Sequence, residues 1–339
     1  GPHLSAFLLA LAIPIEQAIA YYFDIESESI ALCATATASD PIFQFKKLFV
    51  VRLAKRKMKQ QPDMPPFQIL DDWLNQALLL QGCTLGDREL DVANLGAIYL
   101  SDPDHYADEM VRLTDWTVQA MMTPEGQAAT GHWVSLALPK KCNPFDLVST
   151  QPFTEDNETR GSLHLRQREG FSLTDEGMSL RQIQNEVHYC VYCHDKEGDF
   201  CRTGFPVKKK LPELGLKLDA FDQPQTGCPL DERISEMHVL QRDGYVIGAL
   251  AMIMRDNPMC PATGHRICND CMKACIYQKQ DPVNIPQIES GVLWYHTIQQ
   301  IYGHLLEVIA CLYLDIVCHR SRHSSIEILD KFRIRAMNF

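Results

Sequence analysis

Most of the chemistry available to this chain lies in its cysteines. The chain has 339 residues and 13 cysteines, of which eight fall between Cys190 and Cys275. The other five are scattered, and such cysteines usually behave as small buried apolar residues; they are Cys33, Cys83, Cys142, Cys311 and Cys318. A dense group of cysteines instead indicates metal ligation, iron–sulfur cluster ligation or thiol–disulfide chemistry.

The spacing of the eight clustered cysteines divides them into two runs along the sequence. The first run is Cys190, Cys193, Cys201 and Cys228, and the second run is Cys260, Cys268, Cys271 and Cys275. A gap of two residues lets two thiolates reach one metal from a single turn, and a gap of three places them on adjacent turns of a helix. Cys228 and Cys260 each precede a proline, which ends a ligand turn and is frequent around iron–sulfur clusters.

Spacing alone leaves several interpretations open. The chain has no evident export signal, so we expect a cytoplasmic, reducing location, in which disulfides are disfavoured. Two structural zinc sites are possible, with His188, His194 and His265 as additional ligands. Iron–sulfur ligation and a redox-active C-x2-C pair are the other two interpretations, and spacing alone does not separate zinc from iron–sulfur well.

Composition restricts the class of protein. Hydrophobic residues make up 46% and charged residues 22% of the chain, and the formal net charge is −11. These values exclude a mostly disordered, collagen-like or polytopic membrane protein, and the acidic balance argues against nucleic-acid binding. The apolar stretch Leu4 to Ile15 is too short to cross a bilayer, so we expect a buried helix there and no membrane span.

The elements that must position the cysteines are helices, and we expect a mainly α fold. Residues 3–150 are predicted to form a helical N-terminal domain of unknown role, in which Ile69 to Leu80 shows a helical apolar stripe. Residues 151–185 are polar and rich in turn formers, which predicts a linker. Residues 186–291 form the cysteine-rich domain. Residues 292–339 contain an amphipathic pattern from Trp294 to Leu312, which predicts a long C-terminal helix that packs within the chain or against a partner.

The order of elements in the cysteine-rich domain resembles a known family. After Cys228 come two helical segments, which end at Asp256-Asn257-Pro258 just before Cys260, and the segment from Asp281 to Glu289 follows Cys275. This arrangement is similar to the N-terminal α-helical ferredoxin domain of the glutamate synthase small subunit and of dihydropyrimidine dehydrogenase. The resemblance covers about 100 residues and favours iron–sulfur ligation over zinc.

That resemblance implies two [4Fe–4S] clusters and a set of ligands. It implies that Cys190, Cys193 and Cys201 hold one cluster with Glu289 as a non-cysteine fourth ligand. It implies that the other cluster is held by Cys228, Cys260, Cys271 and Cys275. Cys268 has no counterpart in the family pattern, and it is either a competitor of Glu289 for the fourth ligand position or a spectator thiol.

In the family this domain precedes one that binds FAD and NAD(P)H. That domain opens with a G-x-G-x-x-G turn, which this sequence lacks. We therefore expect an iron–sulfur electron-transfer module of an FAD/NAD(P)H-dependent oxidoreductase of the pyridine nucleotide-disulfide type. The flavin and nucleotide would belong to a partner flavoprotein or to a missing domain. The start at Gly1-Pro2 instead of Met favours a fragment of a longer flavoprotein. The chain alone would not be a complete enzyme. The competing hypothesis is a zinc-stabilised helical interaction protein without redox activity.

Overall fold

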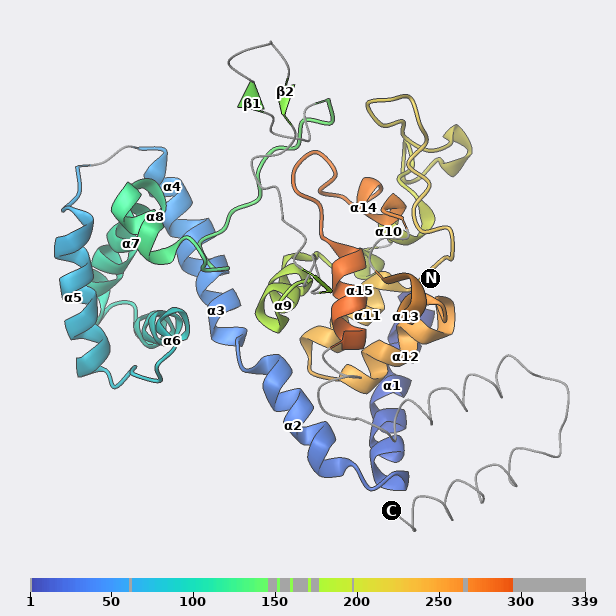
Figure 1. Cartoon of the computed structure of the whole chain (residues 1–339), viewed down its shortest axis with the longest axis horizontal. Helices are drawn as coiled ribbons and strands as arrows, with labels where there is room; N and C mark the ends of the chain where they lie inside the picture. Colours follow the sequence, from blue (N-terminus) through green and yellow to red (C-terminus); the bar gives the residue numbers. More distant parts are fainter. Residues whose placement is uncertain are drawn as a thin grey trace, which may run out of the picture.

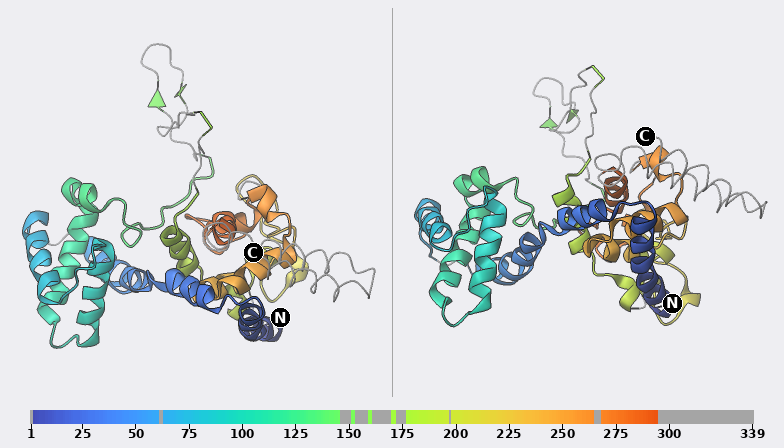
Figure 2. Two further views of the ribbon diagram at one scale, coloured as in Figure 1. Left: turned by 60° about the horizontal axis from the view of Figure 1, so that its bottom comes forward. Right: turned by 90° about the horizontal axis from the view of Figure 1, so that it is seen from below.

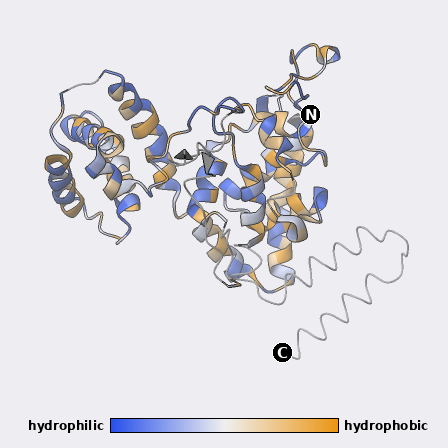
Figure 3. Ribbon diagram, turned by 45° about the horizontal axis from the view of Figure 1, so that its top comes forward, coloured by the Kyte–Doolittle hydropathy of each residue, from blue (hydrophilic) through white to orange (hydrophobic). Residues whose placement is uncertain are grey.

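The protein is mainly α-helical, which confirms the predicted fold class (Figure 1). The computed structural model describes residues 2–60, 63–145, 151–152, 159–160, 170–171, 177–196, 198–264 and 268–294. In this part of the chain the helices assemble into two bodies, each with its own core, and α2 leads from the second body towards the first (Figures 1 and 2). The hydropathy colouring shows apolar and polar stretches alternating along the helices of both bodies (Figure 3).

The first body contains the helices between residues 40 and 130. They are α3 (Asp40–Phe45), the π-helix η1 (Lys46–Ala54), α4 (Lys55–Met58), α5 (Phe67–Leu80), α6 (Arg88–Ser101), α7 (Ala107–Met122) and α8 (Pro124–Thr130). Side-chain caps begin two of them: Asp87 accepts from the Leu90 N–H at the start of α6, and Thr123 accepts from the Gly126 N–H at the start of α8. The fully buried Trp116 lies in the centre of this core.

The second body contains the two N-terminal helices and the cysteine-rich region. Its α-helices are α1 (Pro2–Tyr22), α2 (Glu26–Thr37), α9 (Leu180–Tyr189), α10 (Phe200–Thr203), α11 (Ile234–Arg242), α12 (Val246–Asp256), α13 (Cys260–Thr263), α14 (Asp270–Lys273) and α15 (Ile285–Leu293). Two 3-10 helices join them, η2 (Cys193–Lys196) and η3 (Pro212–Leu214). The helical spacing of Val246, Ala249 and Ile253 predicts one apolar face on α12, and all three residues are almost inaccessible to solvent.

Helices α1 and α2 pack on the cysteine-rich region although they lie at the other end of the sequence. Leu32 and Ala36 of α2 belong to the same core as Leu250 and Ile253 of α12. The segment predicted as one domain, residues 3–150, therefore contributes to both bodies. Of the predicted linker, residues 151–185, the structure describes the start of α9 and the short antiparallel pair β1 (Gln151–Pro152) and β2 (Thr159–Arg160). The predicted C-terminal helix lies outside the described residues beyond Trp294.

Helix α1 turns its polar side chains towards the body and much of its apolar surface outwards. Ser5 is buried and its hydroxyl donates to Glu236, while the buried Glu16 accepts a hydrogen bond from the Gly248 N–H. Phe7 and Ile15 are 60% and 45% exposed. The prediction of a buried helix over Leu4 to Ile15 is therefore wrong, because its anchors are polar.

Among the described residues, one segment, His3–Tyr22 in α1, is long and apolar enough to cross a membrane by length and composition. A core helix or a signal sequence can meet the same criterion.

The two bodies meet at α9. Lys46 donates hydrogen bonds to the carbonyl oxygen of Val134 (2.8 Å) in the first body and to the side chain of Asn185 (2.7 Å) on α9. The ring of His188, also on α9, stacks on Phe43 with 4.5 Å between ring centroids. This contact fixes α9, whose C-terminal end leads directly to Cys190.

Candidate metal centre

Four cysteines from three segments of the chain line one cavity in the second body. They are Cys190, Cys193, Cys201 and Cys275, and we call them the cavity group. Cys201 and Cys275 are buried, and Cys190 and Cys193 are partly buried. The remaining lining comes from apolar residues and from two side chains of α11; it consists of Val191, Ser235, His238, Ile276, Tyr277, Val283 and Ile285.

The chain turns sharply after α9 so that Cys190 and Cys193 both reach the cavity. A capping box at Ser179 and Gln182 starts α9, and Cys190 is the residue at which the helix ends. Tyr192 then adopts a left-handed conformation, with φ of 50°, which brings its N–H to 3.4 Å from the Cys190 sulfur. Backbone donors aimed at a sulfur in this way are one of the means by which proteins tune iron–sulfur clusters.

Close contact between two glycines brings the segments of Cys201 and Cys228 together. Gly204 and Gly227 have φ of 90° and 77°, and a Cβ at Gly227 would lie 2.5 Å from the Gly204 nitrogen. Only glycine fits at such a distance, because any side chain would collide with the facing backbone. The Cys228 N–H therefore reaches the Cys201 carbonyl oxygen at 2.8 Å.

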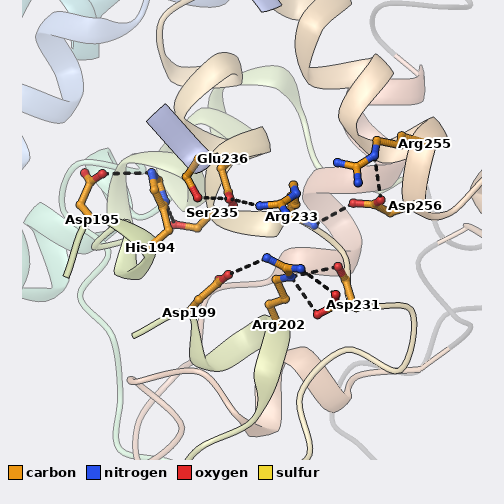
Figure 4. Close-up of polar contacts among 11 residues, drawn as sticks. His194, Asp195, Asp199, Arg202, Asp231, Arg233, Ser235, Glu236, Arg255 and Asp256 are labelled. Carbon is orange, nitrogen blue, oxygen red and sulfur yellow. Dashed lines mark hydrogen bonds and ion pairs between the residues drawn. The ribbon is translucent and has the colours of Figure 1, made fainter. Parts of the chain in front are cut away.

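A charged network holds the same two segments from the outside (Figure 4). Arg202 contacts Asp231 in a bidentate manner, with nitrogen–oxygen distances of 2.8 and 2.6 Å, and Asp199 lies 3.6 Å away. The Arg202 guanidinium lowers the pKa of the Asp231 carboxyl by hydrogen bonding and by charge. Planar two-point pairs of this kind fix geometry as well as adding binding energy.

Burial makes each thiol of the cavity group hard to ionise. Desolvation is the largest cause in every case, and it raises the pKa of Cys190 to about 12 and that of Cys193 to about 11. A thiolate at Cys275 would raise both further, whereas the backbone N–H groups of Tyr277 and Val283 favour the thiolate of Cys275 itself. The thiols would become ligands only with a cationic centre to balance the charge, and binding would release protons.

The other clustered cysteines lie around a pair of buried carboxyl groups. Burial is the main reason that the pKa of Cys228 rises to about 11 and that of Cys260 to about 12, and the charges of Glu232 and Glu289 add to both shifts. The pKa of Cys271 is raised as well, by burial first and then by Glu289, Cys228 and Cys268. We call Cys228, Cys260, Cys268 and Cys271, with Glu232 and Glu289, the carboxylate group.

Glu289 and Glu232 interact directly. Each residue is 6% exposed, and burial is the largest cause that raises the pKa of both carboxyl groups. A hydrogen bond between them raises the pKa of Glu289 and lowers that of Glu232. A proton shared between the two carboxyl groups would stabilise this contact. The pair presents acidic oxygen beside three thiols, which is a mixed donor set for a metal or cluster.

This arrangement differs from the division of ligands that the family resemblance implied. Cys275 lies in the cavity group rather than with Cys271, and Glu289 lies beside Cys228, Cys260 and Cys271 rather than beside Cys190. Helix α14 ends at Lys273, between Cys271 and Cys275, so the helical spacing that would place the two cysteines on one face does not extend to Cys275. Cys268 is exposed and lies near Cys271, so it too is outside the cavity group.

The histidines considered as additional ligands are placed differently. His188 stacks on Phe43 away from the cavity, and His194 is buried with its Nδ1 2.6 Å from Ser235. His265 lies outside the described residues. Sequence reasoning missed His238 and Glu232, although both could have been noted: His238 follows Ser235 by one helical turn, and Glu232 follows the Cys228-Pro229 turn.

The described residues contain no group of three or more His, Cys, Asp or Glu side chains that could hold a single metal ion as they are arranged. Tetrahedral zinc with bonds of about 2.3 Å needs sulfurs about 3.8 Å apart. Thiolates that bind separate iron atoms of one cluster are spaced more widely around a larger volume.

The fold and site define a helical protein with one group of cysteines around a cavity and a second group beside two buried carboxyl groups. Comparison with known proteins adds no named family. No family model matches the chain, and no solved structure matches it. An uncharacterized protein of Rickettsia prowazekii (strain Madrid E) is 71% identical over 45 residues, which is 13% of this chain and 6% of that protein. A second uncharacterized protein of the same organism is 22% identical over 253 residues, which is 70% of this chain and 80% of that protein.

Proposed function

We propose that the second body binds two iron–sulfur clusters and passes single electrons to or from a flavin-containing oxidoreductase domain or partner. The observation that carries this proposal is the cavity group, in which four cysteines from three segments line one cavity. A second set of three buried or partly buried cysteines with Glu289 lies across the Cys201–Cys228 hydrogen bond. Two clusters side by side are the arrangement of an electron relay.

The donor chemistry fits [4Fe–4S] clusters. Thiolates are the usual ligands of these clusters, and backbone N–H groups near their sulfurs, as at Cys190 and Cys275, favour the anionic state. When bound, each cluster would accept or donate one electron. The chain's own contribution is to bury the sulfurs, to keep water away and to fix two ligand sets next to each other.

Iron and sulfide analysis of the anaerobically purified chain tests the proposal. We expect a brown protein with about eight iron and eight sulfide per chain, because each [4Fe–4S] cluster contains four of each. A colourless protein with about two zinc per chain would support structural zinc sites instead. The chain alone should neither oxidise NAD(P)H nor retain FAD, and stoichiometric bound FAD would contradict this assignment of roles.

A further inference from the structure

His238 is buried in the wall of the cavity without a polar partner. It lies on α11 and is 0% exposed, and it lines the same cavity as Cys190, Cys193, Cys201 and Cys275. Ser235, one turn earlier on the same helix, also lines the cavity. The two side chains therefore mark one face of α11 that is turned towards the sulfurs.

Neither ring nitrogen of His238 has a hydrogen-bond partner among the described residues. Ser235 differs, because its hydroxyl lies 2.6 Å from Nδ1 of His194. Burial lowers the pKa of His238 to about 3, so the ring is neutral and has one N–H donor and one acceptor. A buried donor without an acceptor is costly, and such groups are rare in folded proteins.

The cavity suggests what the missing acceptor is. Protonated thiols and apolar side chains offer poor acceptors for an N–H group. An ordered water is also a poor acceptor here, because a buried water needs two to four polar partners and the cavity is lined mainly by thiols and apolar side chains. Anionic sulfur atoms of a bound cluster would be good acceptors, and they would occupy the space that His238 borders.

We propose that His238 donates a hydrogen bond from its ring N–H to a sulfur atom of the cluster held by the cavity group, and so raises the reduction potential of that cluster. This inference rests on the proposed function. A donor near cluster sulfur stabilises the more negative, reduced state, because reduction adds charge to the sulfurs. His238 is then a tuning residue and not a ligand, and the second cluster should be indifferent to it.

The experiment is a redox titration of the full chain, reconstituted with iron and sulfide and followed by absorbance and electron paramagnetic resonance. His238→Leu removes the donor at similar volume, and His238→Gln keeps an N–H donor. We expect His238→Leu to lower the midpoint potential of one cluster and to leave the other unchanged, with His238→Gln closer to wild type. His132→Leu is the matched control, because His132 is exposed in the first body, and it should change neither potential.

Thermal melting of the apo and cluster-loaded forms provides a second readout. His238→Leu should raise the melting temperature of the apo form, since it removes an unpaired buried polar group, and should not do so in the loaded form. Two unchanged midpoint potentials in a fully loaded His238→Leu protein would overturn the inference. Equal changes in melting temperature in the apo and the cluster-loaded forms of His238→Leu would also overturn it. A wild-type chain that takes up no iron would instead overturn the proposed function itself.

Discussion

The backbone N–H of Cys228 donates a hydrogen bond to the carbonyl oxygen of Cys201 across 2.8 Å. Cys201 belongs to the cavity group and Cys228 to the carboxylate group, so one hydrogen bond joins the two candidate centres. The glycine contact and the Arg202–Asp231 ion pair hold this junction on both sides. Under the proposed function, the Cys201–Cys228 hydrogen bond gives an electron a short and rigid path between the two clusters.

The division of ligands can be tested with double variants. Cys193→Ser, Cys271→Ser and Cys275→Ser should each remove about half of the iron, because each removes one ligand of one cluster. Cys193→Ser with Cys275→Ser should lose no more than either alone, since both side chains line one cavity. The double variant of Cys193→Ser with Cys271→Ser should lose nearly all of the iron. Iron analysis and melting curves measure these effects, and the reverse pattern of additivity would show that Cys275 binds the other cluster.

Glu289 and Cys268 are rival fourth ligands of the carboxylate group. We expect Glu289→Ala to destabilise the second cluster, because Glu289 is buried beside Cys228, Cys260 and Cys271. Cys268→Ala should keep full iron, since Cys268 is exposed. Absorbance during exposure to a chelator provides the measurement. A stable Glu289→Ala protein together with a labile Cys268→Ala protein would assign the ligand to Cys268, whose thiolate is the softer donor.

Gly227→Ala should destabilise the cysteine-rich body more than Gly215→Ala. Both glycines have positive φ, but a Cβ at Gly227 meets the Gly204 backbone at 2.5 Å, whereas none of the described atoms lies within 4 Å of a Cβ at Gly215. The positive φ costs each variant about 1–2 kcal/mol, and the collision should cost Gly227→Ala about 1–3 kcal/mol more. Urea unfolding measures the difference, and equal losses in the two variants would show that the close contact has no energetic role.

The free energy of unfolding should increase between pH 8 and about pH 10, because the folded state lowers the pKa of Lys46. Burial lowers its pKa from 10.5 to about 8, against the opposing charges of Glu186 and Glu89. The folded state therefore loses this proton at lower pH than the unfolded state, and stability rises with pH between the two pKa values by at most about 3 kcal/mol. Lys46→Met removes the charge, so unfolding measured at several pH values should show a smaller rise in the variant. The same rise in both proteins would rule out Lys46 as its source.

The sequence was informative where one local pattern decides the outcome. The apolar face of α12, with Val246, Ala249 and Ile253, follows from helical spacing and is buried as expected. In α5 the same reasoning placed Leu70, Ala77 and Leu78 correctly, whereas Ile69 is 60% exposed. An apolar stripe predicts a helix reliably, but the width of the buried face depends on neighbours that the stripe does not specify.

The sequence was less informative where two distant segments decide the outcome. Cysteine spacing identifies Cys271 and Cys275 as candidate ligands, yet Cys275 lines its cavity with Cys190, Cys193 and Cys201, which lie more than 70 residues earlier in the chain. The position of α1 also depends on a distant segment, because Ser5 and Glu16 anchor the helix to residues more than 200 positions later in the chain. No pattern within residues 2–22 shows those partners.

The polar anchoring of α1 also bears on how the chain is made. The Ser5–Glu236 and Glu16–Gly248 contacts join residues 231 and 232 positions apart. At about 5–20 residues per second on the ribosome, α1 waits roughly 10–50 s before α11 and α12 have been synthesised. Throughout that time Ser5 and Glu16 lack their partners and the apolar side chains of α1 are free to aggregate. We therefore expect the nascent chain to need protection at α1 until α11 and α12 have been synthesised.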